Sequence, residues 1–191
     1  MKDSVEQNRA SIIALLEQTG REGIDGLVEW LDNETDYFTA PASSRPGYHG
    51  CHEGGLAEHS ANVYTIFHQK MRQFDLGIKD DELVIASLLH DLCKVNQYRP
   101  NVLKSGALSE AKPYVIEDNL PLGHGEKSVY LATQYIDLTP AEALLMRWHM
   151  GPFDEAWEQW EPRVGKACPA IYAFHSADQE ASKYLDVRVT K

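Results

Sequence analysis

The sequence lacks any run of apolar residues long enough to cross a membrane. A spanning helix needs about 18 or more consecutive apolar residues, and no stretch of the chain reaches that length. The first residues also lack the basic and then apolar pattern of a secretory signal. We therefore expect a cytoplasmic protein that makes no contact with a membrane.

Cysteine is scarce as well. The three cysteines, Cys51, Cys93 and Cys168, are odd in number and form no Cys-x-x-Cys pair. This pattern favours free thiols in a reducing compartment over a disulfide framework. It gives no support for a structural zinc site, and we expect Cys93 to belong to the core.

Positive charge is in deficit. Lys and Arg number 18 against 29 Asp and Glu, which gives a formal net charge of −11. An acidic surface repels the nucleic-acid backbone, so we do not expect binding to duplex nucleic acid. Small anionic substrates are not excluded, because bound divalent cations can make a pocket locally positive on an acidic protein.

What is present indicates one helical domain. The chain has 191 residues, of which 43% are hydrophobic, enough for a core. The spacing of apolar residues predicts helices over 4–19, 26–31, 56–74, 80–95, 123–136, 139 to 150 and 169–185. The glycines and prolines of 35–55 predict a long ordered loop or a lid. Two short strands are predicted around a turn at 104–106, so the fold class is all-α, a helical bundle with one irregular loop or short hairpin excursion.

Four ionisable residues occupy positions where these helices should bury apolar side chains. His90 and Asp91 end the apolar run 83–89, while His59 and Asp178 lie on the apolar stripes of two other helices. A buried carboxylate must be paired, protonated or bound to a metal, because an isolated buried charge costs many kcal/mol. Helices that each direct a His or an Asp inward indicate one shared metal site. Such ligands suit Zn, Fe, Mn, Ni or Co, and the sequence does not distinguish these from Mg.

These residues resemble the HD-domain superfamily of metal-dependent phosphohydrolases. The H…HD…D signature of that family matches His59, the pair His90-Asp91, and Asp178. The segments 54–59, 88–94 and 175–178 are similar to its GGLxEH, LLHDxGK and HxAD strings. The resemblance covers roughly residues 36–185, which we take as the core of a single HD domain over 1–191 with the N-terminal helices of 4–32 packed on it. One departure is Cys93, where the family usually has Gly.

Two further histidines extend the resemblance to members that hold two metals. His124 opens a helix and His149 ends one, and the resulting order H, HD, H, H, D is that of the dinuclear proteins. The HD domain of 3′-to-5′ exoribonucleases looks most similar, whereas the HHE and GYP strings of the cyclic-dinucleotide phosphodiesterases are missing. A plainer alternative is that each of these histidines only caps helix carbonyls.

The resemblance implies a phosphohydrolase or phosphodiesterase in which a metal-activated water attacks phosphorus. Asp91 would bridge two divalent ions and act as a catalytic residue. His59, His90 and Asp178 would complete one metal site, while His124 and His149 would hold the other ion. The expected substrate is a nucleotide or a short oligonucleotide.

Several cationic or polar residues could contact the substrate. Lys94 lies three residues after Asp91 and on the same side of the helix, where it would either touch phosphate oxygens as a catalytic group or only satisfy the helix dipole. Arg45 and Lys127 are weaker phosphate contacts. His49 and His52, in the glycine-rich loop, either contact substrate or only make the loop polar.

Two other functions use the same residues. Some HD-domain proteins are di-iron oxygenases with a similar ligand order, and the ligands found here accept iron as well. The chain could also be a non-catalytic sensor that binds a nucleotide, although the complete ligand set argues against a degenerate module. Homo-oligomerisation remains open.

Overall fold

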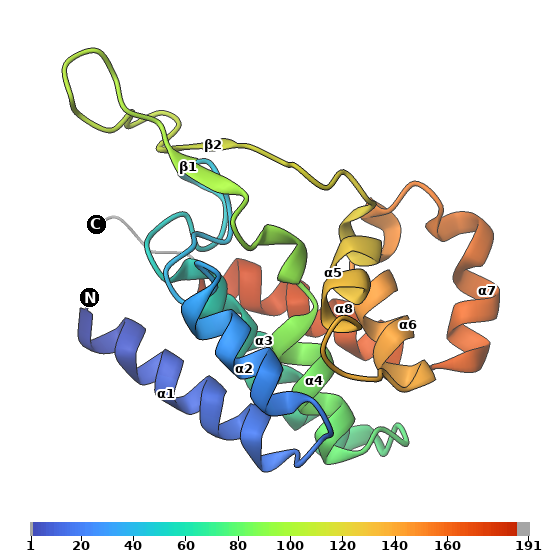
Figure 1. Ribbon diagram of the computed structural model, residues 1–191. Helices are drawn as coiled ribbons and strands as arrows, with labels where there is room; N and C mark the ends of the chain where they lie inside the picture. Colours follow the sequence, from blue (N-terminus) through green and yellow to red (C-terminus); the bar gives the residue numbers. More distant parts are fainter. Residues whose placement is uncertain (1, 187–191) are drawn as a thin grey trace.

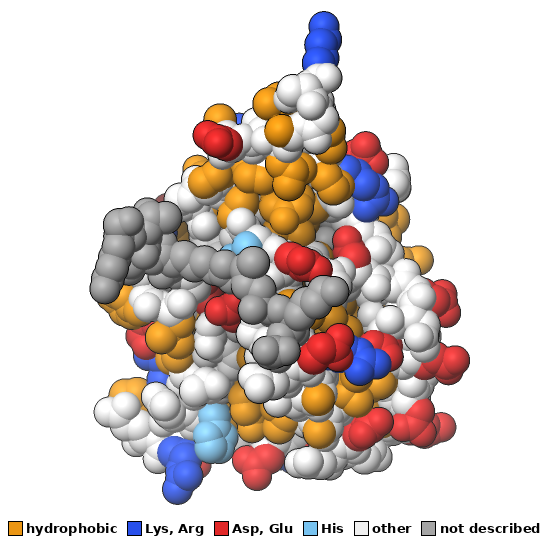
Figure 2. Space-filling view, turned by 90° about the vertical axis from the view of Figure 1, so that its left-hand side faces the viewer, with side chains coloured by type: hydrophobic (Ala, Val, Ile, Leu, Met, Phe, Trp, Pro, Cys, Tyr) orange, Lys and Arg blue, Asp and Glu red, His pale blue; other side chains and the backbone are white. Residues whose placement is uncertain are grey.

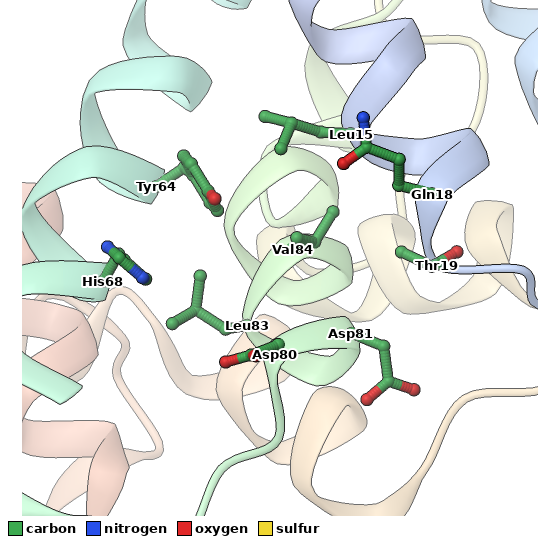
Figure 3. A pocket seen from close by; sticks show the side chains of 9 residues that line it. All are labelled: Leu15, Gln18, Thr19, Tyr64, His68, Asp80, Asp81, Leu83 and Val84. Carbon is green, nitrogen blue, oxygen red and sulfur yellow. The ribbon is translucent and has the colours of Figure 1, made fainter. Parts of the chain in front are cut away.

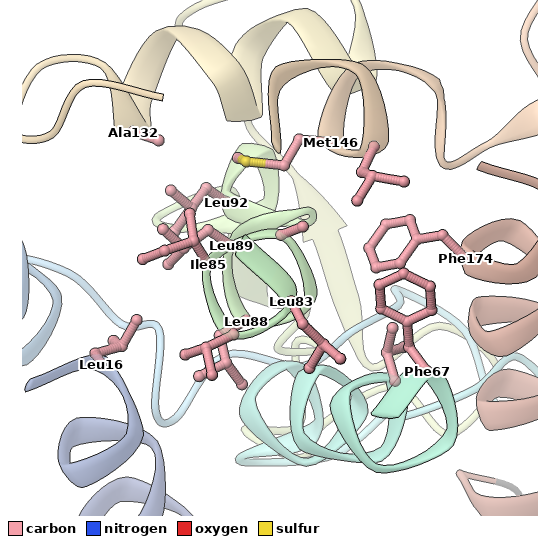
Figure 4. Close-up of a cluster of buried hydrophobic side chains, with 14 of the residues drawn as sticks. Leu16, Phe67, Leu83, Ile85, Leu88, Leu89, Leu92, Ala132, Met146 and Phe174 are labelled. Atoms are coloured by element: carbon pink, nitrogen blue, oxygen red, sulfur yellow. The ribbon is translucent and has the colours of Figure 1, made fainter. Parts of the chain in front are cut away.

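A helix that is apolar on every side lies at the centre of the molecule. In the computed structural model, which describes residues 2–186, all residues from Glu82 to Leu89 of α4 (Asp80–Leu89) are buried. Helices α1 (Lys2–Gln18), α3 (Gly55–Phe74) and α6 (Pro140–Trp148) pack around it. Leu16, Phe67 and Phe174 from three of the surrounding helices enclose its side chains (Figure 4). Since no face of α4 is polar, the sequence can bury it only inside a bundle.

The remaining helices complete this bundle (Figure 1). They are α2 (Ile24–Asn33), α5 (His124–Ala132), α7 (Trp157–Ala167) and α8 (Ala170–Glu180), with short turns η1 (Leu92–Lys94) and η2 (Gly151–Phe153) and a π-helical extension of α8, η3 (Ala181–Leu185). The predicted all-α fold class is confirmed. None of the helices in the described part of the chain is long and apolar enough to span a membrane.

The central helix is shorter than predicted. Helix α4 ends at Leu89, and Asp91, with φ −104° and ψ 21°, lies outside it. The chain then tightens into η1, where the amide of Lys94 donates to the carbonyl of Asp91 at 3.0 Å. The predicted range 80–95 is therefore wrong beyond Leu89. The break frees His90 and Asp91 from the fixed angle of about 100° that separates neighbours in a regular helix.

The segment before α3 is an ordered loop, as predicted. The hydroxyl of Tyr37 donates to the carbonyl of Leu88 at 2.6 Å, which ties the loop to α4. The end of the loop needs glycine for space, because a Cβ on Gly55 would lie 2.0 Å from the carbonyl oxygen of Gly50. This close contact brings the loop against the first turn of α3.

The predicted hairpin is also present and projects from the bundle (Figure 1). Strand β1 (Tyr98–Pro100) pairs antiparallel with β2 (Tyr114–Ile116), with Tyr98 opposite Ile116. Beyond them Val102 pairs with Leu108, and the chain turns at 103–107. Apolar side chains of the hairpin are exposed and gather beneath its tip in Figure 2, a face on which acidic side chains outnumber Lys and Arg.

Helix α7 was not among the predicted elements. Its residues are mostly polar or aromatic, and Pro162 lies inside it, where a proline removes one backbone hydrogen bond. Both features argue against a helix in the sequence. The helix forms at the edge of the bundle, where tertiary contacts stabilise it. Val164 is buried there, and the indole of Trp157 packs edge-on against the ring of Tyr172, with 6.4 Å between the ring centroids.

A buried ion pair joins the N-terminal helices to the rest. The guanidinium of Arg21 lies 2.7 Å from the Oε1 atom of Glu142, whose side chain is 0% exposed, and 3.1 Å from Asp81. Arg9 makes a comparable two-pronged pair with Asp32, at 2.5 and 2.6 Å, but those side chains are 38% and 21% exposed.

These two arginines form a matched test. We expect Arg21→Ala to lower the free energy of unfolding by about 3 kcal/mol, because it removes the opposite charge from the fully buried carboxylate of Glu142, which keeps a hydrogen bond from the backbone amide of Thr139. Arg9→Ala should lower it by less than about 1 kcal/mol, because an exposed pair gains little over water. Urea denaturation of both variants would measure the difference. Equal losses would show that Arg21 does not fix the N-terminal helices to α6.

Candidate metal centre

The carboxylate of Asp91 faces histidines with both of its oxygens. The side chain is buried, and its Oδ1 atom lies 2.8 Å from Nε2 of His124 and 3.6 Å from Nε2 of His149. Its Oδ2 atom lies 3.5 Å from Nε2 of His90 and 3.6 Å from Nε2 of His59. One carboxylate therefore stands between two pairs of imidazoles.

Asp178 adds a second carboxylate on the Oδ2 side. Its Oδ1 atom lies 3.2 Å from Nε2 of His59, and the Nε2 atoms of His59 and His90 are 3.3 Å apart. Three sets of donor atoms lie within 4.8 Å of one another and could hold a metal ion: His59, His90 and Asp178; His90, Asp91 and His149; and Asp91, Cys93 and His124. The structure thus brings all six residues of the predicted metal-ligand set into one cluster.

Backbone carbonyls orient two of these histidines. The Nδ1–H group of His90 donates to the carbonyl of Ser87 at 2.9 Å, and that of His149 donates to the carbonyl of Met146 at 2.7 Å. Each ring therefore directs its Nε2 atom into the cluster. The Nε2 atom of His149 is buried and has no hydrogen-bond partner in the described part of the chain. A lone pair held in this way is the usual arrangement of a metal-ligating histidine.

The carboxylate that orients His59 was missed by the sequence analysis. Asp186, which is buried, accepts a hydrogen bond from Nδ1 of His59 at 2.7 Å and another from the amide of Asn62 at 2.7 Å. Asp186 directly follows the π-helical turns of η3, whose wider winding breaks the 3.6-residue pattern that located Asp178. No spacing rule could therefore place it on the inner face.

Burial and neighbouring charges set the protonation of the cluster. Burial, together with the nearby rings of His149 and His59, lowers the pKa of His90 to about 3. Although burial opposes ionisation of Asp91, the charge of Lys94 holds the pKa of that carboxyl well below its usual range. Burial also disfavours a charged His59, but its hydrogen bonds to Asp178 and Asp186 raise its pKa to about 9. A neutral His90 beside ionised carboxylates is the state that binds a cation, whereas His59 would have to release a proton on binding.

Lys94 is the cation of the centre. Its ammonium lies 2.6 Å from Oδ2 of Asp91, and the residue is 8% exposed. Burial disfavours the ammonium, but the charge of Asp91 outweighs it and raises the pKa of Lys94. This cation is carried by η1, immediately after the break in the central helix.

The loop before α3 contributes one further histidine. The ring of His49 lies 4.7 Å from that of His59, between centroids, and its Nε2 atom is buried without a hydrogen-bond partner in the described structure. Burial and the nearby charge of Lys94 lower the pKa of His49 to about 4, so the ring is neutral at pH 7. His49 therefore lies beside the metal-ligand cluster, where a residue that contacts the substrate would have to be.

The other predicted substrate contacts point elsewhere. Arg45 is exposed on the loop, and Nε2 of His52 lies 3.4 Å from the carboxylate of Glu58. The ammonium of Lys127 pairs with Asp118 at 2.7 Å. His52 belongs to none of the donor sets found in the described residues. His175, by contrast, supports the centre, because its Nδ1 donates to the carbonyl of His149 at 2.7 Å.

The centre does not coincide with the groove shown in Figure 3. That groove has a volume of about 360 Å³ and lies between α1, α3 and α4. Its lining includes Tyr64, His68, Asp80 and Asp81 and no member of the donor sets. The donor chemistry of the described residues therefore locates the candidate site, and cavity size does not.

Comparison with protein families agrees with this geometry. A family model described as HD domain matches residues 56–185, which is more than half of the chain, and the protein belongs to that family. HD domains are in general metal-dependent phosphohydrolases. Comparisons with curated proteins and with solved structures gave no match.

The role of Asp186 can be tested by removing its charge. We expect Asp186→Asn to weaken metal binding by about 10- to 100-fold, because the residue orients His59 and makes its ring a better donor. Asp75→Asn is a matched control that removes one charge at the far end of α3, where an exposed residue adopts a left-handed conformation that Asn also tolerates. Titration with Mn²⁺ or Co²⁺ would measure both variants. Unchanged affinity in Asp186→Asn would contradict the assignment.

Proposed function

We propose that the protein is a dinuclear metal phosphohydrolase or phosphodiesterase that hydrolyses a phosphoester of a nucleotide or a short oligonucleotide. The observation that carries the proposal is the orientation of Asp91, whose two oxygens face separate pairs of histidines. A buried carboxylate in that position is suited to bridge two cations. The protein would act as one HD domain, with the N-terminal helices held to it through Arg21.

The donor atoms fit divalent metal ions. One ion would take Asp91, His59, His90 and Asp178, and the other would take Asp91, His124 and His149. The unpartnered Nε2 of His149 supports this assignment, because a buried acceptor without a partner is costly and is satisfied by a cation. When bound, such ions supply an activated water and take up charge on the phosphoryl oxygens.

The side chains around the centre have separate tasks. Asp91 and Asp178 provide the negative charge that holds cations in a buried place. The carbonyls of Ser87 and Met146 hold the Nδ1 atoms of His90 and His149, so that their Nε2 atoms face the centre, and Asp186 orients the ring of His59, which would release its Nε2 proton when a cation binds.

Two further residues are suited to bind the substrate. Lys94 carries a positive charge beside Asp91 and is the group best placed to contact a phosphate oxygen. Neutral His49, whose Nε2 has no partner in the described structure, can exchange a hydrogen bond with the substrate from the loop side.

The acidic surface supports a small substrate over duplex nucleic acid. The net charge of −11 opposes the approach of a long polyanion, whereas Lys94 and the bound cations would attract a few phosphates locally. The surface places no restriction on homo-oligomerisation.

The metal stoichiometry tests the dinuclear assignment. Protein purified without chelator should contain about two metal ions per chain, and His124→Ala or His149→Ala should contain about one, because each removes a ligand of the same ion. Elemental analysis of correctly folded variants gives the numbers. His68→Ala is a matched control, since His68 lines the separate groove of Figure 3. Full retention of both ions in the first two variants would refute the assignment.

A second test separates hydrolysis from oxygenation. Protein loaded with Mn²⁺, Co²⁺ or Ni²⁺ should release phosphate or a nucleoside monophosphate from at least one nucleotide in the absence of oxygen. Lys94→Ala should lower kcat by about 100-fold with both metals retained, because it removes a charge that acts on the substrate and no metal ligand. Lys104→Ala, which removes an exposed ammonium at the hairpin tip, should change neither.

Two other outcomes would contradict the proposal of a hydrolase. A protein active only with iron, which consumes oxygen and cleaves no phosphoester, would be an HD-type di-iron oxygenase. A protein that binds nucleotides and turns over none of them would be a sensor.

A further inference from the structure

Cys93 places a sulfur atom inside the candidate metal centre. The residue is 3% exposed, and its Sγ atom lies 3.4 Å from Nδ1 and 3.5 Å from Nε2 of His124. Together with Asp91 and His124 it forms a set of three donors within 4.8 Å of one another. From the sequence alone, Cys93 is predicted only to belong to the core.

The distance between the two donor atoms is that of a shared ion, although the His124 ring would have to reorient to bind it. A tetrahedral cation bound at about 2.3 Å to sulfur and about 2.0 to 2.1 Å to nitrogen holds these two atoms about 3.5 Å apart. Sγ of Cys93 and Nε2 of His124 are 3.5 Å apart before any ion is considered. Because Sγ lies almost equally far from Nδ1 and Nε2, it stands beside the ring and off the Nε2 lone pair, so the partly exposed side chain of His124 must turn before both atoms can bind one ion.

His149 gives an independent indication of a ligand at the same place. It is 1% exposed, and its unpartnered Nε2 lies 3.6 Å from Oδ1 of Asp91, the same oxygen that His124 contacts at 2.8 Å. The rings of His124 and His149 lie 5.2 Å apart between centroids. Asp91 thus belongs both to the donor set of Cys93 and His124 and to that of His90 and His149.

The backbone keeps the sulfur in this position. Cys93 lies in the middle of η1, and its amide donates to the hydroxyl of Ser128 on α5 at 3.0 Å. The same helix α5 begins with His124. Because one helix fixes both residues, the distance between the sulfur and the imidazole does not depend on a mobile loop.

We propose that Cys93 is a fourth protein ligand of the ion held by Asp91, His124 and His149, bound as the thiolate after the ion displaces the thiol proton to solvent. This inference rests on the proposed dinuclear function and deepens it. The family usually has glycine at this position, and glycine has no side chain that could bind a metal. With Cys93 as a ligand, the two metal sites of this chain would differ in chemistry. The Cys93 site would prefer zinc, cobalt, nickel or iron over magnesium, because thiolate is a soft ligand. The site formed by His59, His90 and Asp178 would have only nitrogen and oxygen donors.

Cobalt binding can test this proposal without an activity assay. Co²⁺ is titrated into the metal-free protein while absorption is recorded, because a thiolate ligand gives an intense sulfur-to-cobalt band in the near ultraviolet. The wild-type protein should bind two equivalents, and the band should grow with only one of them. Cys93→Ser and Cys93→Gly should lose the band and bind that equivalent at least about tenfold more weakly. Cys51→Ala and Cys168→Ser are matched controls that should keep it, since neither thiol belongs to a donor set of the described residues.

The outcomes separate this inference from the function on which it rests. Two bound cobalt ions without the band in the wild-type protein would overturn the role of Cys93 and leave the dinuclear centre in place. A band that persists in Cys93→Gly would overturn it as well. A wild-type protein that binds no cobalt would overturn both proposals. Because the wild-type spectrum alone decides the first question, a variant that fails to fold would not prevent the test.

Discussion

The burial of Asp91 is the constraint on which the rest of the structure depends. Its carboxylate follows a helix that is enclosed on all sides by apolar side chains, and only 2% of the residue is exposed. A charge in such a place is tolerated only with close partners of opposite sign or with strong donors. Lys94, His124 and the histidines on its other side provide them. The polar centre and the apolar core are therefore two parts of one packing arrangement.

The residues that surround the His90-Asp91 pair come from four other segments of the chain. His59 lies on α3 and Asp178 on α8, whereas His124 begins α5 and His149 follows the last residue of α6. The centre exists only when these helices pack on α4. The contact between core and centre is direct, since the ring of Phe174 meets the ring of His90 edge-on at 5.8 Å. A change in helix packing would therefore alter the donor geometry.

The sequence was most informative where residues are buried and regularly spaced. His59, His90 and Asp178 could be placed on inner faces because each interrupts an apolar stripe, and the helices that carry them were predicted for the same reason. Prediction failed where regular spacing ends. The break after Leu89, the π-helical turns before Asp186 and the proline-containing helix α7 all depend on tertiary contacts that no local pattern encodes. Arg45, His52 and Lys127 were selected for their residue type and their place in the sequence, and neither determines the direction of a side chain.

The hydrogen bond between His59 and Asp186 spans 127 positions of the sequence. During synthesis on the ribosome, His59, His90 and Asp91 emerge long before the carboxylate that orients the first of them. Contacts of such long range close late in folding, because most of the chain must be ordered first. A nascent chain therefore offers a metal ion only scattered single ligands and the adjacent His90-Asp91 pair. The complete set of donors forms only after the last helix has docked, so that the choice of metal is made by the folded protein.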